Sequence, residues 1–349
     1  MANIGGELAD GVERDGQLVG PIAFKDAVDV EATPVRPPTE HSAVVSALPA
    51  RLSNGQQLRC YQGFWVFESW AQGVVAMHRG GLVPRAGDVL LASLPKSGTT
   101  WLKALAFATM ARRACPPASA DHPLRRLNPH DCVPLLERPF ATGRDALLDE
   151  LPSPRLMCTH MPLSLLPATM VDGNSNTKII YICRDQKDRL ISLWHFLKRN
   201  GLEDLSLQEV YESICDGTCF AGPVWDHMLG YWRVSKTDPS RLLFLKYEEI
   251  LQDPANTVRK LAQFVRQPFS DTEEEASIVA EIVKLCSLEN LRSQTANRAG
   301  IQGMFIKFSH DSYFRKGVAG DWRNHMTREM GERLDSIIRG KLCGSGLTI

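Results

Sequence analysis

Between an apolar run at 88–93 and a helix-prone stretch at 99–113 lies a short segment, LPKSGTTW, that could bind an anion. It supplies a cation, a glycine and three hydroxyl groups, from Lys96, Gly98, Ser97, Thr99 and Thr100. A helix that begins here adds unpaired backbone N–H groups and the positive end of its dipole. The segment therefore predicts an anion-binding loop, and the alternative interpretation is a polar turn with a capped helix.

The loop differs from the nucleotide-triphosphatase pattern GxxxxGK[ST], because Lys96 precedes Gly98 and no Gly-Lys pair occurs there. No strand that ends in an acidic residue offers a magnesium ligand beside it. Both features count against a kinase or an ATPase, which remains the first alternative function. Binding of ATP with Mg²⁺ would favour that alternative.

A second cation follows the strand-like run at 178–183. Arg184 comes directly after this run, and Ser192 lies in the helix expected next. Ligands of open α/β sheets collect at the carboxyl ends of strands, and a guanidinium can hold a phosphate with two hydrogen bonds. The alternative is a surface ion pair of Arg184 with Asp185 or Asp188.

A third basic segment lies near the C-terminus, where Arg315 and Lys316 precede Gly317 and Gly320. Two cations on a glycine-rich loop can surround a phosphate with backbone donors, although an isolated segment of this kind is also typical of an exposed turn. Trp322 is expected to pack and to anchor this loop.

Among nine histidines, His160 has the most suggestive place. It ends the strand-like run at 155–159, so it should face the same sheet edge as the anion loop. A neutral imidazole near that loop could accept a proton. A structural histidine is the alternative.

Strand and helix signals alternate along the chain, which predicts an α/β fold with a central, mainly parallel sheet flanked by helices and a phosphate-binding loop after the first core strand. Further strands are expected at 155–159, 178–183 and 241–246, and helices at 99–113, after 183 and after Pro254.

Length and composition predict one large domain. The chain has 349 residues, of which 44% are hydrophobic, and 40 basic residues balance 40 acidic ones. We expect residues 1–40, with Phe24 as their single aromatic, to form a flexible arm and residues 41–349 to form the domain. The zero net charge predicts neither nucleic acid nor a membrane surface as a partner.

The cysteines and the N-terminus indicate a cytoplasmic location. Nine irregularly spaced cysteines without a CxxC pair predict free thiols in a reducing compartment. The N-terminus lacks the basic start and apolar run of a secretory signal, and no apolar run reaches transmembrane length.

Several segments together resemble the cytosolic sulfotransferases, in particular their plant branch. LPKSGTTWLKAL is similar to that family's 5′-phosphosulfate loop, and YICRDQKD with the following SLWHF is similar to its 3′-phosphate segment. RKGVAGDW resembles the family's C-terminal loop, and Thr159-His160-Met161-Pro162 resembles its T-H-x-P segment. The resemblance spans roughly residues 60 to 330.

The resemblance implies that 3′-phosphoadenosine 5′-phosphosulfate is the co-substrate, that no metal takes part, and that a hydroxyl of a small organic molecule accepts the sulfonate. It implies His160 as the general base and Lys96 as a second catalytic residue. It assigns the donor to Lys96, Ser97, Gly98, Thr99, Thr100, Trp101, Arg184, Ser192, Tyr247, Arg315, Lys316 and Gly317. Tyr247 would lie near the adenine, although a core tyrosine is nearly as good an interpretation of it.

The acceptor pocket is expected among aromatic residues. Phe64 and Trp65, in a cluster that also holds Trp70, precede the anion loop, and the stretch 128–137 followed by Phe140 resembles a family region that borders the acceptor. Apolar walls with few polar groups suit a phenolic, flavonoid, steroid or oxylipin alcohol. We expect a monomer or a weak homodimer.

The sequence departs from the family pattern at several positions. Gln186 stands where proline is typical, Arg189 where a smaller residue is common, and Arg323 where lysine is usual. Cys158 occupies a position that is lysine in some members, so the role of that lysine must be absent or supplied elsewhere. A non-catalytic binding protein on the same fold is the second alternative function.

Overall fold

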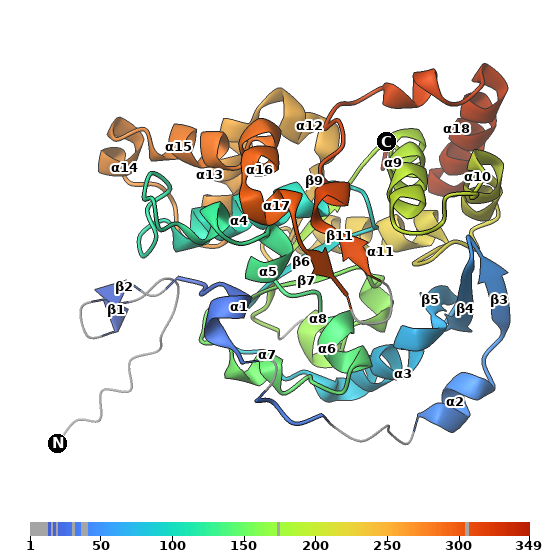
Figure 1. Ribbon diagram of the computed structural model, residues 1–349, viewed down its shortest axis with the longest axis horizontal. Coiled ribbons are helices and arrows are strands. Elements are labelled where there is room, and N and C mark those ends of the chain that lie inside the picture. The colour runs from blue at the N-terminus through green and yellow to red at the C-terminus, as the bar shows by residue number, and fades with distance from the viewer. Residues whose placement is uncertain are drawn as a thin grey trace.

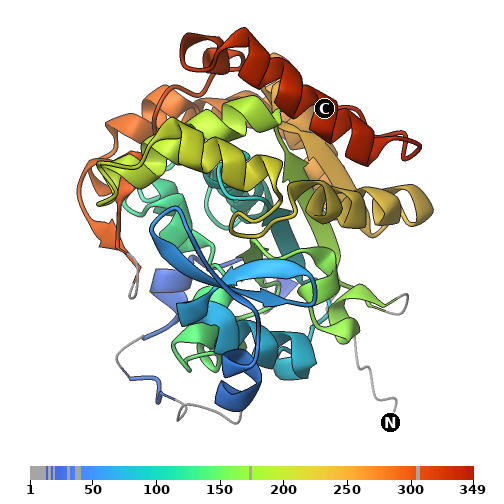
Figure 2. The same cartoon turned by 90° about the vertical axis from the view of Figure 1, so that its right-hand side faces the viewer.

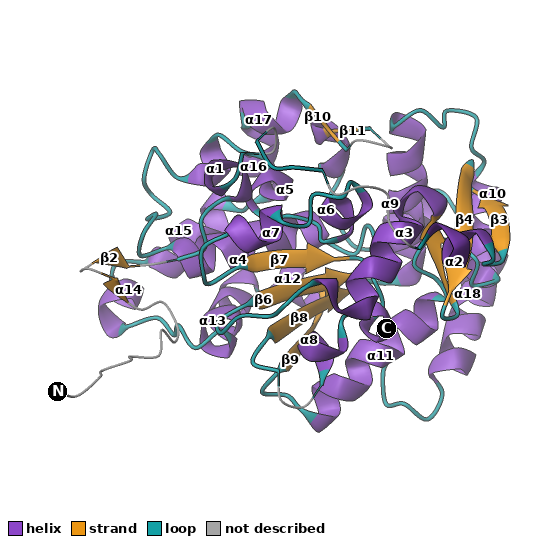
Figure 3. Ribbon diagram, turned by 90° about the horizontal axis from the view of Figure 1, so that it is seen from below, coloured by secondary structure: helices purple, strands orange, loops and turns teal. Residues whose placement is uncertain are grey.

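A computed structural model describes residues 13–14, 17–18, 20–29, 32–35, 41–172, 175–303 and 307–349. Its centre is a four-stranded parallel sheet in the order β7-β6-β8-β9. Figure 3 shows these strands as parallel arrows among helices. Their bounds are β6 (Val89–Ser93), β7 (Leu156–Thr159), β8 (Lys178–Cys183) and β9 (Leu242–Lys246).

Helices cover this sheet, with α4 packed next to β6 and α11 next to β9 (Figure 1). The α-helices are α1 (Phe24–Ala27), α2 (Ser42–Ser46), α3 (Glu68–Ala76), α4 (Thr99–Ala111), α5 (Pro129–Cys132), α6 (Glu137–Ala141), α7 (Leu147–Glu150), α8 (Ala168–Val171), α9 (Gln186–Arg199), α10 (Leu207–Cys215), α11 (Val224–Thr237), α12 (Tyr247–Gln252), α13 (Pro254–Phe264), α14 (Asp271–Glu275), α15 (Ile278–Leu285), α16 (Leu288–Ser293), α17 (Thr295–Arg298) and α18 (Arg328–Leu342). Short turns of other helical types are η1 (Met77–Gly81), η2 (Pro123–Arg125), η3 (Leu163–Leu165), η4 (His310–Tyr313) and η5 (Asp321–Asn324).

A second, antiparallel sheet is formed by β3 (Ala50–Ser53), β4 (Gln56–Tyr61) and β5 (Phe64–Phe67). Figure 2 shows it in blue at the front, with α18 in red along the top. The pairs β1 (Glu13–Arg14) with β2 (Gln17–Leu18) and β10 (Ile301–Gln302) with β11 (Phe308–Ser309) complete the described strands.

The predicted α/β class and the four core strands are confirmed, each strand within one residue of its expected start. β6 is buried along its whole length, as expected for a strand covered on both faces. The three predicted helices correspond to α4, α9 and α13. Helix α4 is buried all round from Leu102 to Ala111 rather than along one stripe.

Part of the predicted N-terminal arm is packed against the domain. Ala23 is buried, Lys25 forms an ion pair with Asp131 at 3.1 Å, and Asp26 receives two hydrogen bonds from Arg126. The expected loose arm is therefore not observed around α1, because one apolar anchor and two ion pairs hold it. Many of the other residues of this arm lie outside the described ranges.

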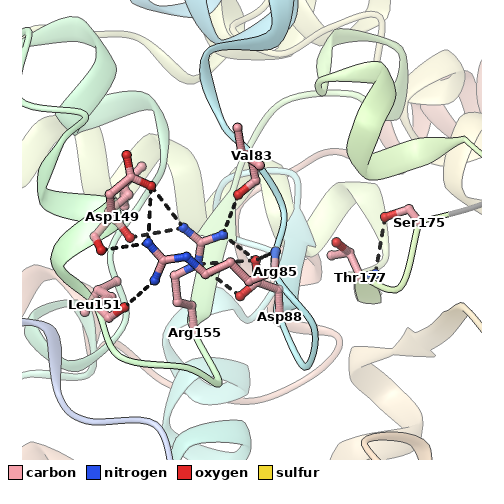
Figure 4. Close-up of polar contacts among 9 residues, drawn as sticks. Val83, Arg85, Asp88, Asp149, Leu151, Arg155, Ser175 and Thr177 are labelled. Carbon is pink, nitrogen blue, oxygen red and sulfur yellow. Dashed lines mark hydrogen bonds and ion pairs between the residues drawn. The ribbon is translucent and has the colours of Figure 1, made fainter. Parts of the chain in front are cut away.

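A buried ion pair fixes the amino edge of the central sheet (Figure 4). Arg155 donates to both carboxylate oxygens of Asp88, at distances from 2.5 to 3.2 Å, and to the carbonyls of Val83 and Leu148. Neither side chain of the pair is exposed to solvent. Because Asp88 precedes β6 and Arg155 precedes β7, the pair ties together the starts of two neighbouring strands.

Within the described ranges, no helix is both long and apolar enough to cross a bilayer. All nine cysteines are free thiols, and most are buried.

We expect the Asp88→Ala substitution to lower the free energy of unfolding by about 3–5 kcal/mol, because the buried Arg155 guanidinium would keep only the largely exposed Asp149, 3.5 Å away, as a counter-charge. Urea unfolding followed by circular dichroism measures the change. Glu212→Ala, which removes the exposed ion pair with Arg333, is the control and should leave the midpoint almost unchanged. Equal midpoints for both variants would contradict the prediction.

Candidate active site

The carboxyl ends of all four parallel strands meet at one cavity of about 390 Å³. The segment after β6 contributes Lys96, the end of β7 contributes His160, the end of β8 contributes Arg184, and the end of β9 contributes Tyr247. Four residues that the sequence predicts as functional are therefore brought together from positions far apart in the chain.

The anion loop takes a backbone path that few residues adopt. Lys96 has a φ of +70° and Gly98 a φ of +105°, both in the left-handed region. A Cβ atom on Gly98 would lie 2.6 Å from the Tyr247 ring. The Ser97 hydroxyl is buried without a hydrogen-bond partner, and Ser97 is not part of the cavity lining. The loop therefore presents backbone groups to the cavity, whereas one of its three hydroxyl-bearing residues, Ser97, does not reach the cavity.

The two threonine hydroxyls of the loop are engaged within the protein. Thr99 Oγ1 lies 2.7 Å from Ser93 Oγ, and Thr100 Oγ1 lies 2.9 Å from His130 Nε2. Both residues line the cavity together with Trp101.

Lys96 points its ammonium over the Phe196 ring, 4.0 Å from the ring centre, and 5.5 Å from that of Tyr313. Burial, together with the neighbouring charges of Arg184 and Arg315, lowers the pKa of Lys96 to about 7. An anion in the cavity would reverse this effect, because it favours the charged ammonium.

His160 is held in a defined orientation. Its Nδ1 lies 2.8 Å from the Ser93 carbonyl oxygen, which can only accept, so Nδ1 carries the proton and Nε2 keeps its lone pair. Its backbone N–H donates to buried Glu137 at 2.6 Å, and its carbonyl accepts from His227 Nε2 at 3.0 Å. Burial lowers the pKa of His160 to about 3, so the imidazole is neutral at physiological pH.

Arg184 does not form the surface ion pair weighed from the sequence. Its guanidinium lies over the Tyr247 ring at 4.4 Å and donates to the Val318 carbonyl at 2.8 Å, while its Nε is buried without a partner. Asp185 instead caps α9, and Asp188 accepts the backbone N–H groups of Gly320 and Trp322. Ser192, on α9, lines the cavity beside Arg184.

The C-terminal basic loop also reaches the cavity. Arg315, Lys316 and Gly317 line it, and both cations are paired with buried Asp321, at 2.6 and 2.7 Å. These ion pairs hold the pKa of Asp321 well below its usual range despite its burial. Trp322 packs against α18, as its sequence position led us to expect. Its ring lies so close to Gly331 of that helix that a Cβ atom added to Gly331 would come within 2.9 Å of it.

The aromatic wall of the cavity includes Trp70 of the expected cluster, but its other two residues, Phe67 and Phe220, were not predicted. Phe64, Trp65 and Phe140 do not belong to the lining, whereas Phe67, Trp70 and Phe220 do. Phe67 stacks on Phe220 with ring centres 4.0 Å apart, and Trp70 meets both rings edge-on.

Local structure explains why Trp65 and Phe140 do not line the cavity. Phe67 and Trp65 both point away from the buried Val66 side of β5, but only the carboxyl end of that strand reaches the cavity. Phe140 is buried where α6 packs closely against Gly73 of α3.

The sequence did not assign a role near His160 to two polar residues, Glu137 and Lys103. Glu137 accepts the Thr159 hydroxyl as well as the His160 amide, and burial raises its pKa. Lys103 is wholly buried and donates to the Val133 carbonyl at 2.8 Å. Its Nζ also lies 3.2 Å from His130 Nδ1.

Lys103 could have been noticed in the sequence because it is the one charged residue of helix 99–111. Its charge acts on Cys158 and on His160. This residue therefore brings a cation near the position where some family members have lysine in place of Cys158.

The described residues that line the cavity include six cations and no Asp or Glu; the cations are Lys96, Arg138, Arg184, Arg189, Arg315 and Lys316. Such a lining favours ligands with several negative charges. Among the described residues, no group of three or more His, Cys, Asp and Glu is arranged to hold a metal ion.

Comparison with known proteins identifies the family of this chain. The family model of the sulfotransferase domain matches residues 86–346. Cytosolic sulfotransferase 10 of Arabidopsis thaliana is 40% identical over 324 residues, which cover 89% of this chain and 95% of that protein. Flavonol 3-sulfotransferase of Flaveria bidentis is 40% identical over 294 residues, covering 83% of this chain and 92% of that one.

Solved structures share the fold. A crystal structure described as that of a candidate steroid sulphotransferase from Arabidopsis thaliana has a TM-score of 0.70 at 34% identity, covering 89% of this chain and 95% of that one. A mouse sulfotransferase complexed with PAP has a TM-score of 0.63 at 24% identity and covers 83% of this chain and 95% of its own.

The chain therefore belongs to the sulfotransferase family, a class of group-transfer enzymes. Within that family it falls in the plant cytosolic branch, as its relatives from Arabidopsis and Flaveria indicate.

We expect Gly98→Ala to destabilise the protein by about 1–3 kcal/mol, because alanine must adopt a left-handed φ and meet the Tyr247 ring. Thermal or urea unfolding measures this effect. Gly230→Ala is the matched control, since Gly230 lies inside α11 and its added Cβ would meet only Leu163 at an ordinary 3.7 Å. That variant should be as stable as the parent or slightly more so. An equal loss of stability in Gly98→Ala and Gly230→Ala would argue against strain in the loop.

Proposed function

We propose that this enzyme transfers a sulfonate group from 3′-phosphoadenosine 5′-phosphosulfate to a hydroxyl of a small organic acceptor, with His160 as general base. One observation carries the proposal: a neutral, oriented imidazole and a free lysine ammonium line the same cavity, which holds several further cations and no carboxylate among its described lining. The PAP-bound structure of the mouse relative supports the choice of donor.

The donor would bind along the cationic side of the cavity. In this proposal the loop from Lys96 to Trp101 holds the 5′-phosphosulfate, and Arg184 with Ser192 holds the 3′-phosphate. The unpaired Nε of Arg184 and the helix start at α4 are groups that an anion would satisfy. Tyr247 would border the adenine, and the loop at 315–317 would cover the nucleotide.

Proton transfer would use Nε2 of His160. Because Nδ1 is committed to the Ser93 carbonyl, Nε2 is the nitrogen that can receive the acceptor's hydroxyl proton. The low pKa of His160 in the free protein keeps it unprotonated, and the donor's negative charge would raise that pKa toward a more useful value.

The transfer itself would be a direct displacement at sulfur. The acceptor oxygen forms a bond to sulfur as the bond between sulfur and the bridging phosphosulfate oxygen breaks, and the proton goes to His160. Charge that grows on the leaving oxygen would be stabilised by Lys96 and the loop amides. Cationic side chains and the helix start supply the neutralisation, so donor and acceptor are the only partners that this scheme requires.

The acceptor would lie against the Phe67, Trp70 and Phe220 wall. This wall suits a phenolic, flavonoid, steroid or oxylipin alcohol. The names of the Arabidopsis relatives support a cytoplasmic location, and we propose a monomer or a weak homodimer.

We expect the purified protein to transfer labelled sulfonate to some members of a mixed library of hydroxylated small molecules. His160→Ala should reduce turnover by about 10²–10⁴-fold, because the acceptor would lose its base. The control His41→Ala replaces a histidine outside the cavity and should keep full turnover. Full activity in a folded His160→Ala protein would refute the base, and no transfer with any acceptor would refute the function.

We expect the affinity for 3′,5′-adenosine bisphosphate to fall as the pH rises through about 7, because binding favours the protonated form of Lys96 and that form is lost above its pKa. In Lys96→Met this part of the pH dependence should disappear. Isothermal titration at several pH values, in buffers of different ionisation enthalpy, measures both affinity and proton uptake. Tight binding of ATP with Mg²⁺ and none of the bisphosphate would favour a kinase instead.

A further inference from the structure

The cavity contains two cations that the proposed reaction does not use, Arg138 and Arg189, and Arg189 is the more deeply buried of the two. Arg189 lies on α9 and lines the cavity, together with Ser192, Leu193 and Phe196 of the same helix. Residues at this spacing share one face of a helix, so Arg189 extends the cavity-facing stripe toward the start of α9. Its exposed fraction to bulk solvent is 0%.

The guanidinium of Arg189 is only partly satisfied. Its Nε donates to Gln186 Oε1 at 2.6 Å, and the Gln186 amide in turn donates to the Arg184 carbonyl at 2.8 Å. Its Nη2 is buried and has no hydrogen-bond partner. Two of the residues at which this sequence departs from the family pattern, Gln186 and Arg189, thus pair with each other, and one guanidinium nitrogen of this lining residue stays without a partner.

No counter-charge for Arg189 is found among the described residues. Tyr181 and Cys219 are the titratable side chains whose charges would act on it, and burial raises the pKa of both. Both are therefore neutral at physiological pH. A buried cation without an anion is costly to the fold, whereas an anionic ligand would compensate it.

Arg189 also lies against the side chain of Cys219, with which it forms a hydrogen bond. This contact associates Arg189 with the side of the cavity where the acceptor would lie.

Cys219 immediately precedes Phe220 of the aromatic wall. Two more polar atoms of lining residues, Ser53 Oγ and Asn54 Oδ1, are also buried without partners. The acceptor side thus combines an apolar wall with polar groups that still lack a ligand.

We propose that the acceptor is a hydroxylated molecule that also carries a carboxylate, which pairs with Arg189 while the apolar body lies on the Phe67, Trp70 and Phe220 wall. The inference rests on the proposed function for the role of the hydroxyl. A carboxylate fits the guanidinium better than a neutral oxygen, because a charge-assisted bond is stronger and relieves the uncompensated charge.

The test measures binding without turnover. Para-hydroxyphenyl alkanoates of graded chain length, each matched with its primary amide, are titrated into protein saturated with 3′,5′-adenosine bisphosphate. At the best chain length the acid is expected to bind about 10- to 100-fold more tightly than the amide. Arg189→Met should abolish this preference, and Arg189→Lys should restore part of it. The bisphosphate affinity should stay unchanged in both variants.

Arg184→Met is the matched control, because it should weaken the bisphosphate and leave the acid preference intact. Equal binding of acids and amides by the parent protein, or no binding of acids at any chain length, would overturn the inference without touching sulfonate transfer. The inference would also be overturned if Arg189→Met lowered the affinity for the bisphosphate as strongly as Arg184→Met does. The comparison of acid with amide in the parent protein needs no variant, so it stands even if a substitution impairs folding.

Discussion

The candidate active site depends on Ser93, the last residue of β6. Its carbonyl accepts the Nδ1 proton of His160, and its hydroxyl bonds to Thr99 at the start of α4. One residue therefore sets the tautomer of the imidazole and positions the anion loop. Because β6 is buried along its length and paired on both sides, this anchor moves only if the central sheet moves.

Charge is the second constraint on the site. Among the residues that the structure describes, no carboxylate pairs with Lys96; burial and the nearby arginines lower its pKa, so an anion would change its protonation. Two other cations, Arg315 and Lys316, share one carboxylate, that of Asp321. The cavity thus mixes charges that are partly compensated with charges that have no counter-charge, and the second kind indicates where an anionic ligand would bind.

The features that could be predicted from the sequence are those that depend on short segments of the chain. The core strands, the anion loop at Lys96 and the strand-end position of His160 follow from local patterns and from the rule that strand ends share one edge. Glu137 and Lys103 could not be found in this way, because their contacts with Thr159 and Val133 join segments more than twenty residues apart. Phe64 and Trp65 were chosen in place of Phe67 because only the tertiary fold decides which end of β5 meets the cavity.

Asp321 has a consequence for the free protein. If the loop that carries Arg315 and Lys316 closes over the nucleotide, both cations must be shared between Asp321 and the nucleotide's phosphate groups. If the spent nucleotide then departs, Asp321 would pair with both cations again, so that one of their two positive charges would be compensated. Departure of the product would thereby be eased, and the loop would keep its shape between turnovers.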